Sequence, residues 1–172
     1  NATRYWISKV FEKENLIVID ADDVKLKKLF LPIFKNELEK QFIYNSVENT
    51  NNKLRSLGYE PKINPRVLNL FFLEDKKRHR IIFENNVFKI GDSNLKLEEI
   101  LSLLNSSPEK FSPNVLMRPI YQELLLPNLV YVGGPSELVY WSQLKKSFDQ
   151  VDINFPVLIL RDHFNWMSEK SY

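Results

Sequence analysis

The chain has 172 residues, a formal net charge of +2 and 27% charged residues, a composition typical of a globular protein of about one domain. It contains no cysteine, which excludes disulfides, a thiolate nucleophile, zinc–cysteine sites and iron–sulfur clusters. The two histidines, His79 and His163, are too far apart for a histidine-rich metal site, and no apolar run reaches the ~20 residues of a membrane-spanning helix. We therefore expect neither a metal nor a membrane partner.

The first sixty residues are expected to combine helices with one buried strand. Residues 3–14 have a helical pattern, and the apolar run Leu16–Asp20 is typical of a buried parallel strand. Asp22 or Asp23 is expected to cap a long helix that continues to about Leu57.

A small antiparallel meander is predicted after the linker that the next prolines mark. Its strands are Val67–Leu73, Arg80–Glu84 and Val87–Ile90, with turn residues between them, and a helix over Leu95–Leu104 follows. The dense basic run at 76–80 falls in a hairpin turn, where charge is simply solvated. We therefore expect no nucleic-acid partner.

The last part of the chain alternates helix and strand. We expect helices over Ser112–Leu126 and Pro135–Phe148, and strands over Leu129–Val132 and Val157–Leu160. Strand, helix and strand in that order predict a βαβ unit with a right-handed crossover in a parallel sheet. The fold class is therefore α/β.

The first candidate site is the turn that follows the strand at 129–132. Gly133 and Gly134 are two of only four glycines in the chain, and a helix begins directly after them. Free N–H groups at a helix start, next to glycines, suit a carboxylate or phosphate. The alternative is a tight turn without a ligand, because the spacing matches neither a P-loop nor a dinucleotide-binding fingerprint.

The second candidate is one face of the helix expected over Ser112–Leu126. Asn114, Arg118 and Gln122 recur every four residues and so share a face, and the planar guanidinium suits a bidentate grip on a carboxylate or phosphate. Pro119 is expected to kink this helix in its middle. The alternative is an ordinary solvent-exposed face.

The third candidate is the helix that begins at Pro135. Glu137 and Tyr140 fall on one side of it, together with Trp141. Glu137 could bind a substrate ammonium or hydroxyl group, or merely complement the helix dipole. The two aromatic residues are most simply explained as core.

A longer pattern contains all of these candidates. It reads SPNVxxRPxxQ from Ser112 to Gln122, followed by LPxxxYVGGPxELxYW from Leu126 to Trp141. This pattern resembles the bacillithiol biosynthesis cysteine-adding enzymes, a family of cysteine ligases. Weaker similarity extends over nearly the whole chain.

The resemblance implies a Rossmann-like core related to nucleotidylyltransferases and class I aminoacyl-tRNA synthetases. Residues 1–60 would supply a core strand and a long helix, residues 61–110 an inserted β-meander and helix, and residues 111–172 a βαβ core segment. The implied activity is addition of L-cysteine to glucosaminyl-malate, the last step in making the low-molecular-weight thiol bacillithiol. The implied substrate-binding residues are Asn114, Arg118, Gln122, Gly133, Gly134, Glu137 and Tyr140.

The chain departs from the family in lacking its Thr-Gly-His-Gln-type nucleotide motif and its C-terminal coiled coil. We therefore expect an internal fragment that is inactive alone. The catalytic residue and the cofactor stay unknown, with ATP or another nucleotide as candidates. We expect a cytoplasmic, homodimeric full-length enzyme. The alternative is a non-catalytic binding or assembly module, distinguished by whether residues 114, 118 and 122 line one cleft with the turn at 133–137.

Overall fold

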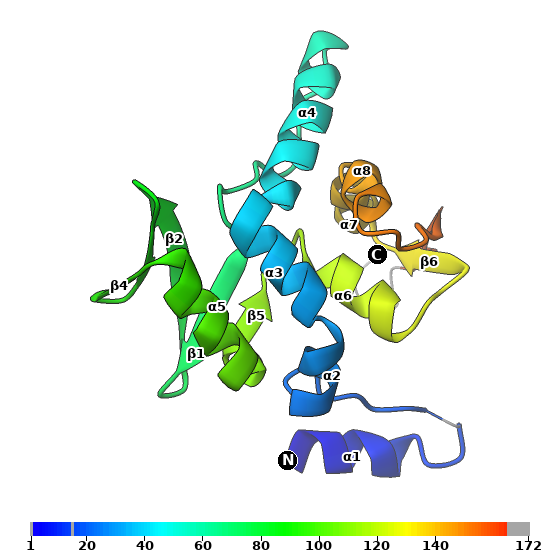
Figure 1. Cartoon of the computed structure of the whole chain (residues 1–172). Helices are drawn as coiled ribbons and strands as arrows, with labels where there is room; N and C mark the ends of the chain where they lie inside the picture. The colour runs from blue at the N-terminus through cyan, green and yellow to red at the C-terminus, as the bar shows by residue number, and fades with distance from the viewer. Residues whose placement is uncertain (1, 15, 165–172) are drawn as a thin grey trace, which may run out of the picture.

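The computed structural model describes residues 2–14 and 16–164. Two sheets and a set of helices make up the fold (Figure 1). The helices are α1 (Ala2–Val10), α2 (Val24–Leu29), α3 (Leu31–Lys40), α4 (Phe42–Ser56), α5 (Leu97–Ser106), the 3-10 turn η1 (Pro108–Lys110), α6 (Arg118–Leu125), α7 (Pro135–Ser142) and α8 (Lys145–Asp149). The strands are β1 (Leu70–Glu74), β2 (Lys77–Glu84), β3 (Val87–Ile90), β4 (Ser93–Leu95), β5 (Phe111–Pro113), β6 (Val130–Gly133) and β7 (Val157–Leu160).

The larger sheet is antiparallel and has the strand order β4-β3-β2-β1-β5. The predicted meander is confirmed as β1, β2 and β3. Its two turns take positive φ at Asp75, Lys76, Asn85 and Asn86, the geometry that tight two-residue hairpins need. β4 and β5 were not expected. β5 matters most here, because it attaches the segment after residue 110 to this sheet.

The smaller sheet contains the parallel pair β6 and β7. The α/β class and this predicted pair are therefore confirmed, although most strands belong to the antiparallel sheet. The division into segments 1–60, 61–110 and 111–172 stays a prediction. β5 from the third segment pairs with β1 from the second.

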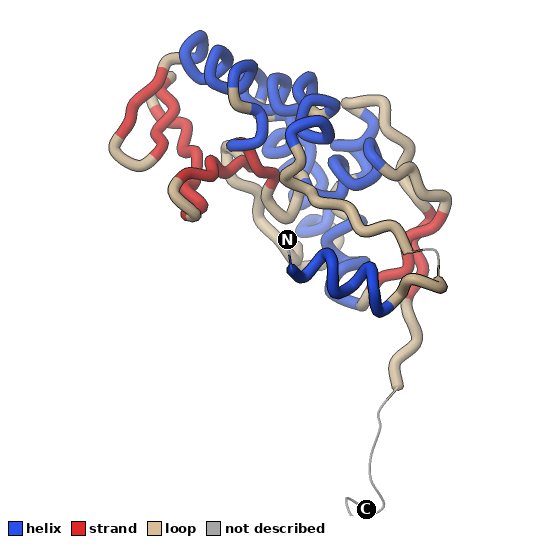
Figure 2. Tube along the Cα trace, turned by 90° about the horizontal axis from the view of Figure 1, so that it is seen from below, coloured by secondary structure: helices blue, strands red, loops and turns tan. Residues whose placement is uncertain are grey.

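The buried strand expected at Leu16–Asp20 is wrong. These residues form no strand, and Ile17 is 78% exposed. A strand needs a neighbour to take up its backbone hydrogen bonds, and no described segment pairs with this one. Figure 2 shows the run as a loop along the surface, between α1 and α2.

The long helix expected up to Leu57 is three helices. Asp23 does cap α2, since its side chain accepts a hydrogen bond from the Lys25 N–H at 2.8 Å. Pro32 then occupies the first turn of α3, where its missing N–H costs nothing. Gln41 takes a left-handed backbone with φ of 48° between α3 and α4, which redirects the chain.

The two later helices also differ from expectation. Ser112 lies in β5 and caps nothing, so α6 begins only at Arg118. Pro119 stands in the first turn of α6 and does not kink it. The helix expected over Pro135–Phe148 breaks at Gln143, whose buried side chain donates hydrogen bonds to Asn51 and to a backbone carbonyl.

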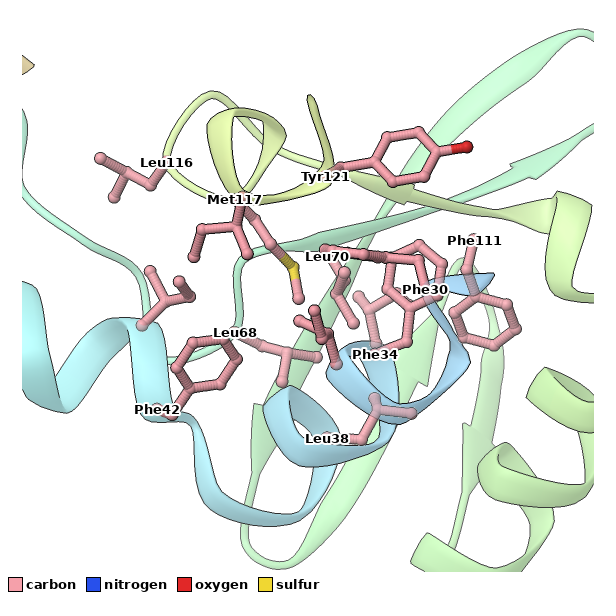
Figure 3. Packing of buried hydrophobic residues seen from close by; sticks show 14 of the residues in the cluster. Phe30, Phe34, Leu38, Phe42, Leu68, Leu70, Phe111, Leu116, Met117 and Tyr121 are labelled. Atoms are coloured by element: carbon pink, nitrogen blue, oxygen red, sulfur yellow. The ribbon is translucent and has the colours of Figure 1, made fainter. Parts of the chain in front are cut away.

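One hydrophobic core joins the helices to the larger sheet. Phe30, at the junction of α2 and α3, packs against Phe34 of α3, which in turn packs against Phe111 at the start of β5 (Figure 3). Tyr121 of α6 contacts Phe30, with ring centroids 4.9 Å apart. α6 is thereby fixed against the α2–α3 junction, which positions Arg118. None of the described helices is both long and apolar enough to cross a bilayer.

Candidate functional site

Asn114 builds the turn that starts α6. Its Oδ1 accepts hydrogen bonds from the N–H groups of Leu116 at 2.9 Å and Met117 at 3.1 Å. Its Nδ2 donates to Oδ1 of Asn69 at 2.8 Å. The side chain is therefore committed to the fold and does not lie on a helical face with Arg118 and Gln122.

Arg118 is held by two side chains. Its Nη1 donates to Oε1 of Gln122 at 3.0 Å, one turn further along α6. Its Nη2 donates to the hydroxyl of Tyr140 on α7 at 3.0 Å. Three of the predicted residues, from two separate segments, thus form one hydrogen-bonded group. As a whole residue Arg118 is exposed, although its hydrogen bond to Tyr140 is partly buried.

The β6–α7 turn is closed by Glu137. One carboxylate oxygen accepts a hydrogen bond from the Gly134 N–H at 2.9 Å, and the other accepts from the Tyr131 hydroxyl at 2.8 Å. These two hydrogen bonds lower the pKa of Glu137. The side chain is therefore an ionised cap at the start of α7.

Tyr131 connects the turn to Arg118. Burial raises the pKa of the Tyr131 hydroxyl, its hydrogen bond to Glu137 raises it further, and the nearby guanidinium of Arg118 opposes both effects. The Tyr131 ring stacks on the buried indole of Trp141, with centroids 4.1 Å apart. The core interpretation of Trp141 is therefore confirmed, and Tyr140 is also buried.

The two glycines serve packing. A Cβ on Gly133 would lie 2.7 Å from Cε1 of Tyr131, closer than side chains tolerate, so the Tyr131 ring requires a glycine there. At Gly134 a Cβ would lie 3.4 Å from the Arg161 guanidinium. Glu137 already occupies the Gly134 N–H, so this group is not free for an anion.

The predicted residues come together only in part. Arg118, Gln122 and Tyr140 form one group, Gly134 and Glu137 form another, and Tyr131 lies between them. Arg118 lines two cavities, and neither of them includes a residue of the turn at 133–137. A single cleft shared by these residues stays a prediction.

Arg118 lines two cavities on other sides. One, of about 220 Å³, is mostly apolar and is formed with Tyr121, Gln122 and Leu125. The other, of about 290 Å³, is formed with Lys27 and Arg78. Within residues 2–14 and 16–164, no cluster of three or more histidine, aspartate or glutamate side chains could hold a metal ion.

Sequence reasoning missed three residues of this region. Tyr131 lies two residues before Gly133, on the same face of β6. Because glycine is rare in this chain, Gly133 was the signal that a large side chain lies next to it. Lys27 stands three residues before Phe30 and seven before Phe34, and this helical spacing to apolar residues was the available signal. Arg78 carried no such signal, because only the pairing of β1 with β5 brings it near Arg118.

Comparison with known proteins places the chain in a family. Residues 1–162 match the family described as "Bacillithiol biosynthesis BshC, N-terminal Rossmann-like domain". The chain is 45% identical over 172 residues to a protein of Flavobacterium johnsoniae, which covers 99% of this chain and 32% of that protein. Identity is 32% over 160 residues to a protein of Bacillus thuringiensis, covering 90% of this chain and 30% of that protein.

Both relatives carry the name "Putative cysteine ligase BshC". A protein of Christiangramia forsetii with the same name is 42% identical over 164 residues. The chain spans about a third of the length of the curated relatives it matches. The similarity covers the segments that hold Arg118 and the β6–α7 turn.

Proposed function

The chain belongs to the bacillithiol biosynthesis BshC family, through its N-terminal Rossmann-like domain, and from this premise we propose that its full-length protein is a cysteine ligase. The proposed reaction adds L-cysteine to glucosaminyl-malate, the last step of bacillithiol biosynthesis. The names of the relatives support ligase chemistry. The substrate identity rests on the motif resemblance described above. A cytoplasmic homodimer is part of the proposal.

One structural observation carries the assignment of a site. Arg118 is an exposed cation whose direction is set by Gln122 and Tyr140, so two of its nitrogens are already placed by the protein. A guanidinium held in this way loses little conformational entropy when it binds a carboxylate. The glucosaminyl-malate substrate carries two carboxylates at its malate end. We assign Arg118 to one of them.

The other residues of the group act by positioning. Gln122 and Tyr140 orient Arg118, and Glu137 holds Tyr131 and Gly134 in the turn beside it. Both oxygens of Glu137 are occupied by these contacts. In this proposal Glu137 therefore shapes the turn, and the sugar hydroxyls or amine of the substrate meet Gln122 and Tyr140 first.

The reaction forms an amide between the cysteine carboxyl group and the sugar amine, so the carboxyl oxygen must leave as part of an activated group. A nucleotide could supply that activation. The β6–α7 turn does not fit a nucleotide phosphate, because the ionised Glu137 caps the Gly134 N–H and would repel an anion. In this proposal no nucleotide phosphate binds at this turn.

A second candidate is a non-catalytic binding or assembly module of the same fold. The observation in its favour is that neither of the two cavities lined by Arg118 includes the turn at 133–137. In that case the Arg118 group would dock against another domain or protein. Loss of Arg118 would then change assembly, with no change in the turnover of assembled protein.

The test uses cells that lack the gene for the full-length protein. The ligase proposal expects bacillithiol to disappear, glucosaminyl-malate to accumulate, and the wild-type gene to restore both levels. Arg118→Ala should fail to restore them while the purified variant keeps its melting temperature. Lys145→Ala is the matched control, because Lys145 is an exposed cation on α8 whose ion-pair partner is Asp149.

The outcomes separate the candidates. Normal bacillithiol in cells without the gene would refute the ligase proposal. Full rescue by Arg118→Ala would refute the role given to Arg118. A lower melting temperature that accounts for the lost activity would make Arg118 a structural residue.

A further inference from the structure

The cavity of about 290 Å³ beside Arg118 brings together side chains from three parts of the chain. Lys27 comes from α2, Arg78 from β2 and Arg118 from the start of α6. Three cations and one carboxylate, that of Asp22, line this cavity, which leaves an excess of two positive charges. Such an excess in a confined space favours an anionic ligand.

The ammonium group of Lys27 is buried and contacts protein atoms on two sides. Its side chain is 1% exposed, and its Nζ donates to the carbonyl oxygen of Phe111 at 2.6 Å and lies 3.2 Å from a carboxylate oxygen of Asp22. Burial lowers the pKa of Lys27, and the charge of Arg78 lowers it further, against the opposing effect of Asp22. Asp22 is thus already paired with Lys27, and neither Arg78 nor Arg118 forms an ion pair within the described part of the chain.

Arg78 is oriented before any ligand arrives. Its Nη2 donates to the carbonyl oxygen of Pro113 at 2.8 Å and to the Ser112 hydroxyl at 3.3 Å. Its guanidinium lies over the ring of Phe71, 3.9 Å from the centroid. Its Nε and Nη1 donate to no other group in the described part of the chain. These nitrogens are therefore available to a ligand.

We propose that this cavity binds a small organic dicarboxylate, with one carboxylate on Arg78 and the other on Arg118. The identity of this ligand rests on the proposed function: it is the malate end of glucosaminyl-malate. The β1–β2 hairpin then contributes directly to substrate binding through Arg78. Lys27 contributes charge from inside the wall and pairs with Asp22.

A dicarboxylate fits better than a single phosphate. Both ligands are dianions and would satisfy the excess of two charges. The two guanidinium groups come from different elements, however, and each can donate a charged hydrogen bond to a separate carboxylate. Malate carries two such groups on one short chain, whereas phosphate offers one compact centre.

The test measures binding to the full-length protein by calorimetry, with L-malate and inorganic phosphate as the probes. Arg78→Ala should weaken malate binding by about tenfold or more, the loss expected for one charged hydrogen-bonding contact. Arg78→Lys should be intermediate, because it keeps the charge and loses the planar set of oriented donors. Lys77→Ala is the matched control, since Lys77 is an exposed neighbouring cation that does not line the cavity.

Equal malate affinity in Arg78→Ala and wild type would overturn the inference, and so would wild-type protein that binds no malate. Phosphate that binds more tightly than malate with the same dependence on Arg78 would also overturn it. Circular dichroism of each variant guards against misfolding.

The binding assay needs no turnover, so its result is separable from the ligase proposal. Malate binding that depends on Arg78, in a protein that adds no cysteine, would support this site and refute the proposed function. Turnover with a KM for glucosaminyl-malate unchanged by Arg78→Ala would support the proposed function and refute this site.

Discussion

Glu37 is a fully buried carboxylate whose replacement should change both the stability of the fold and its pH dependence. One carboxylate oxygen accepts a hydrogen bond from the Ile43 N–H at 3.1 Å, at the start of α4. The other accepts from the Asn69 N–H at 2.9 Å and from Nδ2 of Asn69 at 3.1 Å. One side chain thus connects α3, α4 and the segment that enters β1.

The expected loss in the free energy of unfolding depends on how many buried donors are left without an acceptor. In Glu37→Gln the amide oxygen can replace the oxygen that faces Asn69, and the NH2 group then meets the Ile43 N–H, donor against donor. One unsatisfied buried donor costs about 1–3 kcal/mol of the free energy of unfolding. In Glu37→Ala both backbone N–H groups lose their acceptor, so we expect about twice that cost.

The pH dependence has a definite sign. Burial raises the pKa of Glu37 from 4.5 to about 7, against the opposing effect of its hydrogen bonds. Between these values the folded state holds a proton that the unfolded state has lost, so this group's contribution to stability falls as pH rises. The fall is on the order of 3 kcal/mol between pH 4.5 and 7. The amide introduced by Glu37→Gln cannot titrate, so the deficit of this variant relative to wild type should shrink as pH rises.

Urea unfolding followed by circular dichroism, at several pH values between 4.5 and 8, measures this difference. Comparing the two proteins cancels the titration of all other groups. A deficit that stays constant over this range would show that Glu37 does not titrate there. A deficit that grows with pH would mean that the hydrogen bonds outweigh burial, which would reverse the reasoning.

Three further predictions concern other parts of the chain. Gly133→Ala should lower the free energy of unfolding by about 1–3 kcal/mol through overpacking against the Tyr131 ring. Gly58→Ala is the control, because it adds a Cβ in open space and tests backbone strain alone. Equal losses measured by denaturant unfolding would contradict the packing argument. Ser46→Ala should cost about 1 kcal/mol, because its hydroxyl is hydrogen-bonded to that of Ser147 at 2.6 Å in the core, and a double-mutant cycle in which both single losses simply add would show no coupling. The purified 172-residue chain should form no bacillithiol from L-cysteine and glucosaminyl-malate, and product detected by mass spectrometry would refute this expectation.

Local chemistry was sufficient to predict several elements from the sequence. The hairpin turns contain Asp75, Asn85 and Asn86, residue types that tolerate positive φ, with strand-forming segments on either side. Asp23 caps α2 because its side chain reaches an N–H two residues away. The parallel pairing of β6 with β7 followed from two short apolar runs separated by a helical segment. In each case the deciding contacts lie within a few residues or within one supersecondary unit.

Tertiary contacts decided the remaining features, since their partners are distant in the sequence. The helical pattern before Leu57 did not reveal the break at Gln41, where buried Glu37 supports the new direction through Ile43 and Asn69. The run at Leu16–Asp20 has the composition of a buried strand, yet no described segment pairs with it.

The same distinction between local pattern and tertiary contact applies to the candidate site. The motif predicted Arg118, Gln122 and Tyr140, and the structure brings these three together. It could not indicate that Asn114 serves the backbone, or that Arg78 lies near Arg118, because those facts depend on the pairing of β1 with β5. Sequence spacing determines which side chains share a local face, whereas only the packing of remote segments determines which charges meet in one cavity.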